Sequence, residues 1–334
     1  MNSILNFDIS SITYRRVEKH EQQQVVDLVC PIFKTNPDME KSYFSLDASP
    51  CYQEGDTLGA WQNDKLVSVV HIRRLALRSN ETNEKYSCGG FGNVATVDKY
   101  RRRGLSRHLL RMAIDRMEKN NEFDISMLST EKPNHYTVLG WESVPRPSQI
   151  IINWKNITSS SINAEWRSAS NISSEDIELL LKIHSNNPRI YQIDRSPSTL
   201  FQHWVKKRWQ NNAAIVCLYE HEEEQGYVVI GKPDSEKDIC VLEWCAPNFN
   251  LETKLLSLAA IEIRQRYGST KPICLLALPQ YMKIDELTEW AGPLQIKISK
   301  DLMMRNIRLP KEVYEKIKLA YSEGRAVFWI GDYF

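Results

Sequence analysis

Several features that mark particular classes of protein are absent from this chain. No stretch approaches the ~20 apolar residues that cross a bilayer. The first residues, MNSILNFDISS, lack a basic region followed by an apolar core, so we expect neither a membrane partner nor a secretory signal. The seven cysteines are odd in number and form no CxxC pair, which predicts reduced thiols in a cytoplasmic protein.

An excess of charge of one sign is also lacking. The 43 Lys and Arg residues nearly cancel the 42 Asp and Glu residues, so no overall field attracts nucleic acid. Any anion must therefore be recognised locally. No grouping of Cys, His and Asp has the spacing of metal ligands, and no GxSxG or Walker loop occurs, so we expect no metal.

Length and periodicity predict two domains. A chain of 334 residues exceeds one comfortable core, and 42% hydrophobic residues fit a globular protein. Its first half predicts helices at 21–33 and 105–117 and strands at 12–17, 57–62, 66–77, 86–97, 124–129 and 141–154. A second half of similar order predicts helices at 174–184 and 251–267 and strands at 165–169, 213–220, 226–231, 240–245 and 273–278. Residues 1–154 and 165–334 would form the domains, and residues 155–164, rich in Ser and Asn, the linker.

The most informative stretch is residues 89–110, GGFGNVATVDKYRRRGLSRHLL. A strand interrupted by glycines, a sign of a bulge or close backbone approach, leads into a basic turn and then a helix. This order directs unpaired N–H groups and the positive end of the helix dipole at one point, which suits the phosphates of a nucleotide-like cofactor. Alternatively, the arginines would simply be exposed to solvent at the N-terminus of a helix and bind no ligand. Cations are mildly unfavourable there, so four of them indicate a compensating anion: Arg101, Arg102, Arg103 and Arg107.

Two motifs here resemble the GNAT superfamily of N-acetyltransferases. RRRGLS, ending at Ser106, resembles the R/Q-x-x-G-x-G/A loop whose N–H groups hold the pyrophosphate of acetyl-CoA, although Ser replaces the usual Gly or Ala. YTVLGWE, starting at Tyr136, looks like the Y-x-x-x-G-F/W-E signature. The resemblance covers about residues 12–154. It implies an α/β (α+β) fold with a mixed, mostly antiparallel sheet flanked by helices. Residues 165–334 would be a GNAT-like domain that completes the acceptor site. This domain would be degenerate, because APNFN at 246–250 stands in place of the arginine-glycine turn.

A narrower resemblance is to the enhanced-intracellular-survival (Eis-like) branch, which joins an active GNAT module to a degenerate one. It rests on YRRRGLSRHLL, on residues 133–136, and on an aromatic end after a hydrophobic strand at 326–334. Many members carry a further lipid-carrier-like module, so residues 279–334 would be a reduced remnant of it. Members of the branch also tend toward hexamers, which implies a homo-oligomer.

The implied activity is transfer of an acetyl group from acetyl-CoA to a primary amine of a small molecule or peptide. Tyr136 would be the general acid, because a phenol of pKa ~10 can protonate a thiolate at small cost. The Eis-like resemblance implies that the terminal carboxylate of Phe334 is the base. Contacts with acetyl-CoA are expected from Ala95, Val97, Arg102, Arg103, Gly104, Leu105, Ser106, Arg107 and Asn134.

Alternatives to this interpretation stay open. Tyr136 could simply pack its ring, and Phe334 could be a frayed end. The whole chain could be a non-enzymatic CoA-binding regulatory protein, or an interaction module with both halves degenerate. A cationic acceptor would need carboxylates around the cleft, and the sequence offers Asp47, Glu54, Glu142 and Asp332 without placing them.

Overall fold

Most strands of the first half assemble into one sheet. The computed structural model of the protein describes residues 11–154, 164–196, 198–221, 224–233, 238–268 and 271–333. The order of the first sheet is β1-β2-β3-β4-β5-β15-β6, with β9 paired to β3. Its one parallel pair among the described strands is β4–β5. The strands are β1 (Ile12–Arg16), β2 (Thr57–Gln62), β3 (Lys65–Arg78), β4 (Lys85–Thr96), β5 (Ile125–Ser129), β6 (Glu142–Ser143), β9 (Gln192–Ile193) and β15 (Leu302–Asn306).

The second sheet repeats this plan. Its order is β8-β10-β11-β12-β13-β7-β14, and β12–β13 is the parallel pair among the described strands. The two sheets therefore share both strand order and the place of the parallel pair. The strands are β7 (Arg146–Ile152), β8 (Trp166–Ser168), β10 (Ile215–His221), β11 (Glu224–Gly231), β12 (Cys240–Cys245), β13 (Ile273–Leu275) and β14 (Leu294–Ser299).

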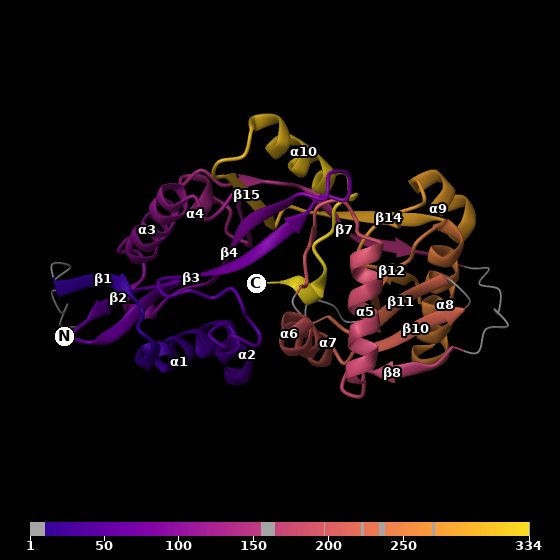
Figure 1. Ribbon diagram of the computed structural model, residues 1–334, viewed down its shortest axis with the longest axis horizontal. Helices are drawn as coiled ribbons and strands as arrows, with labels where there is room; N and C mark the ends of the chain where they lie inside the picture. The colour runs from indigo at the N-terminus through magenta and orange to yellow at the C-terminus, as the bar shows by residue number, and fades with distance from the viewer. Residues whose placement is uncertain are drawn as a thin grey trace, which may run out of the picture.

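The two sheets exchange one strand each. β7, from the first half of the chain, pairs with β13 and β14 in the second sheet. β15, from the second half, pairs with β5 and β6 in the first sheet. Figure 1 shows these strands crossing the seam between the halves, with the C-terminus also between them. The expected linker lies outside the described residues except for Ala164, and the domain limits stay a prediction.

Helices cover both faces of each sheet. In the first sheet, one core lies under α3, whose inward residues Leu105, Leu109, Ala113 and Met117 follow helical spacing. A second core lies under α1 on the opposite face. In the second sheet, α8 and α5 cover opposite faces (Figure 1). The helices are α1 (Gln22–Phe33), α2 (Pro37–Lys41), α3 (Leu105–Asn120), α4 (Asn134–Thr137), α5 (Ser174–Asn186), α6 (Ser198–Leu200), α7 (Lys206–Asn211), α8 (Phe249–Tyr267), α9 (Ile284–Ala291) and α10 (Lys311–Ser322).

Most predicted elements are confirmed, and so is the fold class. The expected turn between the second and third strands is present, with Asn63 and Asp64 at φ values of 46° and 61°. A bulge is present beside the strand glycines. Val69 pairs with Ala95 but His71 pairs with Gly92, so β4 carries one residue more than β3 between these pairs.

Two expectations for the C-terminal part are wrong. Residues 279–333 are not the remnant of a separate module, because they supply one strand to each sheet, β14 and β15, together with α9 and α10. Residues 326–329 form no strand, and a short 3-10 turn follows at Ile330–Asp332. The first error arises because β14 and β15 pair with strands far from them in sequence, and the second because the apolar residues 326–329 are buried without joining either sheet.

Candidate functional site

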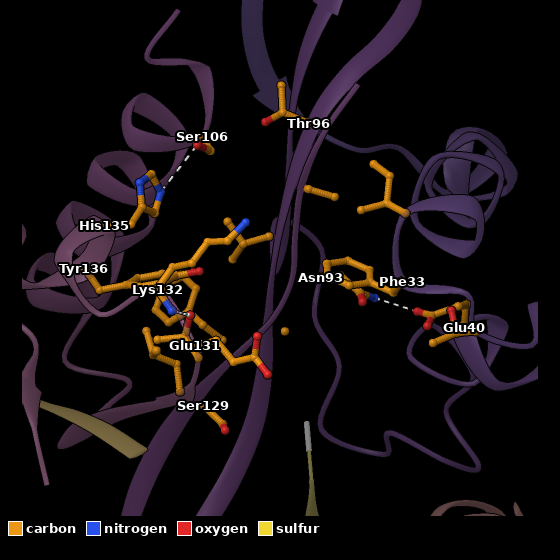
Figure 2. A pocket seen from close by; sticks show the side chains of 18 of the residues that line it. Phe33, Glu40, Asn93, Thr96, Ser106, Ser129, Glu131, Lys132, His135 and Tyr136 are labelled. Carbon is orange, nitrogen blue, oxygen red and sulfur yellow. Dashed lines mark hydrogen bonds between the residues drawn. The ribbon is translucent and has the colours of Figure 1, made fainter. Parts of the chain in front are cut away.

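A cleft opens where β4 and β5 separate. The two strands pair only from Cys88 to Gly90 and from Ile125 to Met127 among the described residues, although both continue further. The bulge at Asn93, whose φ is 53°, follows this paired stretch, and the end of β4 beyond it stays paired with β3 through Ala95 and Thr96 but, within the described chain, not with β5. The resulting cleft has a volume of about 1220 Å³. Figure 2 shows its side chains projecting from both sides of the central strands.

The basic turn closes one end of the cleft. After β4 the chain makes a short 3-10 turn, Asp98–Tyr100, and enters α3 through Gly104 at φ 80°. A Cβ at Gly104 would meet no atom within 4 Å, so the space before the helix is open. The first N–H groups of a helix have no carbonyl partner within it, and here Arg102 and Arg107 also line the cleft. This end of the cleft can hold an anion with phosphate chemistry.

Tyr136 lies in the same cleft, on α4. Its side chain is buried among His135 and Trp141, with ring centroids 5.0 and 6.1 Å away. This burial raises the pKa of the Tyr136 phenol to about 12. His135 Nε2 lies 3.4 Å from Ser106 Oγ and so connects α4 to the first turn of α3 (Figure 2). Burial, followed by the charges of Arg107 and Lys132, lowers the pKa of His135.

The remaining wall of the cleft comes from α1, α2 and α7. Phe33, Met39 and Tyr43 line it with apolar surface. Glu40 accepts a hydrogen bond from Asn93 Nδ2 at 2.8 Å. Figure 2 shows these two residues across the cleft from His135 and Tyr136. The sequence prediction missed Glu40 and Asn93; the only signal was the glycine pattern that predicted a bulge.

The cleft brings together some of the residues expected to hold acetyl-CoA. Val97 and Leu105 pack against the cores instead, and the Val97 N–H donates to the Val67 carbonyl at 3.0 Å. Arg103 and Asn134 are exposed and lie outside the cleft wall. Those that line it are Ala95, Arg102, Gly104, Ser106, Arg107 and Tyr136.

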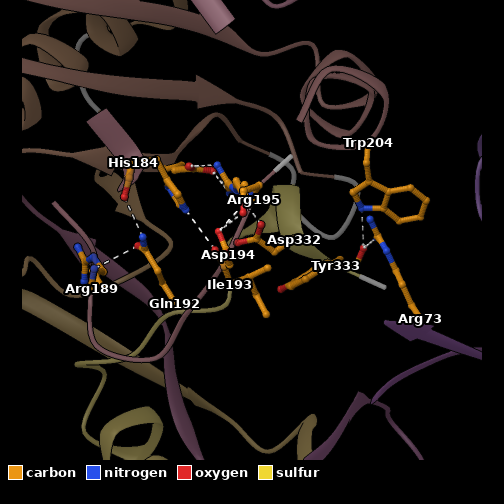
Figure 3. Close-up of polar contacts among 12 residues, drawn as sticks. Arg73, His184, Arg189, Gln192, Ile193, Asp194, Arg195, Trp204, Asp332 and Tyr333 are labelled. Atoms are coloured by element: carbon orange, nitrogen blue, oxygen red, sulfur yellow. Dashed lines mark hydrogen bonds and ion pairs between the residues drawn. The ribbon is translucent and has the colours of Figure 1, made fainter. Parts of the chain in front are cut away.

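The C-terminal segment ends at the seam between the sheets. The carbonyl oxygen of Tyr333 accepts hydrogen bonds from Arg73 Nη1 at 3.2 Å, Trp204 Nε1 at 3.1 Å and Arg208 Nη2 at 3.1 Å. Arg208 also lines the cleft. Figure 3 shows Arg73 and Trp204 meeting at Tyr333. Phe334, the expected base, lies outside the described residues.

The carboxylates considered for a cationic acceptor lie elsewhere. Asp332 is buried and accepts from Arg195 Nε at 2.8 Å (Figure 3), and Glu142 pairs with Lys318 at 2.8 Å. Glu54 is paired with Arg16 at 3.3 Å and Asp47 is exposed. The carboxylates that line the cleft are those of Glu40 and Glu131.

The corresponding place in the second sheet is built differently. Between β12 and α8, the side chain of Asn248 accepts from Leu251 N at 2.9 Å and so caps the helix. Glu252, in the first turn of α8, accepts from Trp244 Nε1 at 2.8 Å and from the backbone N–H groups of Gln280 and Tyr281 at 2.7 and 2.8 Å. An internal carboxylate therefore satisfies the donors that gather here.

A family model matches the part of the chain that contains the basic turn and Tyr136. The family model described as acetyltransferase (GNAT) domain matches residues 13–144. These residues belong to the GNAT acetyltransferase family. The GNAT domain thus contains the β4–β5 cleft, the basic turn and Tyr136, and it is an acyltransferase domain. A search of curated protein sequences finds no match.

Solved GNAT structures resemble almost the whole chain. A probable N-acyltransferase from Enterococcus faecalis aligns with a TM-score of 0.69 at 16% identity, covering 89% of this chain and 73% of its own. Eis1 from Mycobacterium abscessus aligns with a TM-score of 0.61 at 13% identity over the same shares. Yeast N-myristoyltransferase, solved with bound myristoyl-CoA, gives 0.53 at 12% identity, covering 90% of this chain and 84% of its own. At these identities the likeness concerns the fold, and in that respect the expected resemblance to the Eis-like branch is confirmed.

The described residues also bear on metal binding and on membrane spans. Within the described residues, no group of three His, Cys, Asp or Glu side chains is arranged to hold a metal ion. In the same part of the chain, every helix is too short or too polar to cross a bilayer.

Proposed function

We propose that this chain is an N-acetyltransferase that moves an acetyl group from acetyl-CoA to a primary amine of a small molecule or peptide. The observation that carries the proposal is the joint presence of the basic α3 turn, the β4 bulge and Tyr136 in one cleft. Each of these features suits a different part of a thioester of CoA.

The α3 turn would hold the pyrophosphate. Backbone N–H groups of the first helical turn, with Arg102 and Arg107, would supply hydrogen bonds and positive charge. The open space at Gly104 supports this role, because backbone can approach a phosphate closely where no side chain intervenes.

The end of β4 would hold the thioester. Past the bulge, strand N–H groups near Ala95 no longer face β5 as a partner and can donate to the thioester carbonyl. A neutral amine then attacks the carbonyl carbon, the carbon–sulfur bond breaks, and the nitrogen loses a proton. Tyr136 would donate its phenolic proton to the departing thiolate. The burial that raises the pKa of Tyr136 would also raise the pKa of a thiol beside it. The two pKa values therefore stay close enough for the proton to pass from the phenol to the thiolate.

The base for the amine stays a prediction. The terminal carboxylate of Phe334 is the expected group. The hydrogen bonds from Arg73, Trp204 and Arg208 to the Tyr333 carbonyl support it, because they tie the preceding residue to Arg208, which lines the cleft. A cytoplasmic location and a homo-oligomer are likewise predictions.

Thiol release from acetyl-CoA in the presence of a panel of primary amines tests the function. We expect turnover with at least one amine and a fall in kcat of about 100-fold or more in Tyr136→Phe. Tyr281→Phe is the matched control, because Tyr281 follows β13 much as Tyr136 follows β5, yet its hydroxyl donates to the Ala246 carbonyl at 3.2 Å. Unchanged turnover in Tyr136→Phe would remove Tyr136 from the reaction. Tight CoA binding without turnover over the whole panel would favour the regulatory alternative.

A further inference from the structure

One carboxylate of the cleft is buried without a cation. Glu40, on α2, is 3% exposed yet belongs to the cleft wall. Its carboxylate accepts a hydrogen bond from the neutral amide of Asn93, at 2.8 Å. Among the described residues, no Lys, Arg or His nitrogen lies within 4.0 Å of it. Burying a carboxylate away from a positive charge is costly, so its place in the wall of a cleft calls for a cation from outside.

Asn93 fixes this carboxylate beside the point of acyl transfer. Asn93 is the bulge residue of β4, and its backbone leads directly to the segment proposed to hold the thioester. Its side chain donates to Glu40, so the carboxylate is one hydrogen bond from the bulge. A group bound by Glu40 would therefore lie close to the reacting carbonyl.

Charged side chains of both signs line the cleft: Glu40 and Glu131, and the cations Lys34, Arg101, Arg102, Arg107, Lys132 and Arg208. Arg101, Arg102 and Arg107 line the end at α3. Away from them, Glu40 and Glu131 face the cavity from opposite sides, as Figure 2 shows. The arginines at α3 suit the pyrophosphate, and Glu40, which is held by a neutral amide, suits a cation.

The surroundings of Glu40 also define the shape of that cation. Phe33, Met39 and Tyr43 give apolar and aromatic surface on the same wall, which suits methylene groups next to a charge. Arg208 also lines this wall, but its Nη2 donates to the Tyr333 carbonyl, and its guanidinium lies 4.9 Å from the centre of the Trp204 ring. These contacts hold its guanidinium at the seam.

We propose that Glu40 is a specificity residue for an acceptor with two positive charges, of the class of alkyl diamines, an inference that rests on the proposed acetyltransferase function. The amine that reacts must be neutral when it attacks, whereas a carboxylate stabilises an ammonium. Glu40 therefore binds the second, non-reacting ammonium, and the methylene chain between the two nitrogens lies along the apolar wall. Asn93 is a positioning residue that orients the Glu40 carboxylate.

A comparison of two acceptors of equal length tests this proposal. Diaminopentane and aminopentanol, each with its groups at the two chain ends, differ in the charge of the second group. We expect kcat/KM to favour the diamine by about 10-fold to 100-fold, the range for a hydrogen bond to a charged group, beyond the factor of two from its second amine. In Glu40→Gln this preference should fall to near that factor of two, mainly through a higher KM for the diamine. Asp38→Asn removes the same charge from an exposed position on α2 and should keep the preference.

Each outcome bears on the proposal. Equal kcat/KM for both acceptors in the wild type would overturn it and leave the acetyltransferase function standing. An equal loss with both acceptors in Glu40→Gln would mean a structural role and overturn it as well; thermal unfolding and CoA calorimetry on the variant identify that case. If no amine is acetylated although CoA binds, the proposed function fails and this inference fails with it.

Discussion

The two halves of this chain share one strand order but differ at the junction between the central strand and the helix that follows it. In the first, β4 leads through Gly104 into α3, and the space in front of the helix is open. In the second, β12 leads through Asn248 into α8, the Asn248 side chain caps the helix, and Glu252 binds the nearby backbone N–H groups. The first junction is open, as the proposed pyrophosphate site requires, whereas the second is occupied by side chains of the protein itself.

This difference separates a fold from a site. Strand order and the single parallel pair are common to both sheets, so they do not decide where a ligand binds. Under the proposed function, the side chains at one strand-to-helix junction decide where the ligand binds. Substitutions at the two junctions should therefore affect different properties of the protein.

Removing the internal carboxylate should destabilise the protein. Glu252→Ala leaves Trp244 Nε1 and two backbone N–H groups without their acceptor, and it removes the carboxylate that lies 3.8 Å from the buried Arg189. We expect a loss of about 3–5 kcal/mol in the free energy of unfolding, measured in urea. The exposed Glu289→Ala should change it by less than about 0.5 kcal/mol. A stable Glu252→Ala protein with weakened CoA binding would instead make the second junction a ligand site.

A side chain at the first junction should prevent CoA binding. Gly104→Val places a branched side chain at φ 80° in the open space before α3. We expect CoA to bind about 100-fold more weakly, which corresponds to about 2.7 kcal/mol. Gly268→Val, at φ 104° and also in open space, imposes comparable backbone strain at the end of α8. Calorimetry in which both variants lose affinity equally would attribute the effect to strain alone.

The arginine of the first helical turn should matter less. Arg107→Ala removes one positive charge from the cleft, and we expect about 10-fold weaker CoA binding together with a smaller dependence on salt. Arg111→Ala, exposed on the same helix one turn further on, should bind CoA like the wild type. Titrations at low and high ionic strength measure both properties. Identical losses for the two arginines would point to general charge and against a local site.

The smallest effect concerns pH. Burial raises the pKa of Tyr136 to about 12, so its phenol keeps its proton through the whole range in which an ordinary tyrosine, of pKa ~10, begins to ionise. We therefore expect no fall in kcat between pH 8 and 10 that depends on Tyr136. For the same reason its contribution to stability is complete below pH ~10 and is lost as the pH rises through about 12. An alkaline decline near pH 9 that vanishes in Tyr136→Phe would contradict this.

Local patterns predicted most of the elements. Helical spacing of Leu105, Leu109 and Met117 gave α3, and the glycines of β4 predicted the bulge, because both signals depend on neighbours in the chain. β15 escaped prediction, since nothing near Leu302–Asn306 indicates a partner more than 170 residues earlier. Strand exchange is a property of the two sheets together.

The site divides in the same way. The arginine turn and Tyr136 were visible as motifs, whereas Glu40 on the short helix α2 carried no pattern. Its partner in the cleft is Asn93, the bulge residue, which lies 53 residues away in sequence.

The sequence alone determined the periodicity of its strands and helices, the arginine-glycine turn and the tyrosine motif, because these depend on residues within one or two turns of chain. The tertiary structure decided which junction stays open, which strands cross the seam and which carboxylates face the cleft. Those outcomes depend on contacts between residues far apart in sequence, because a buried charge needs a partner that only the folded chain brings near it.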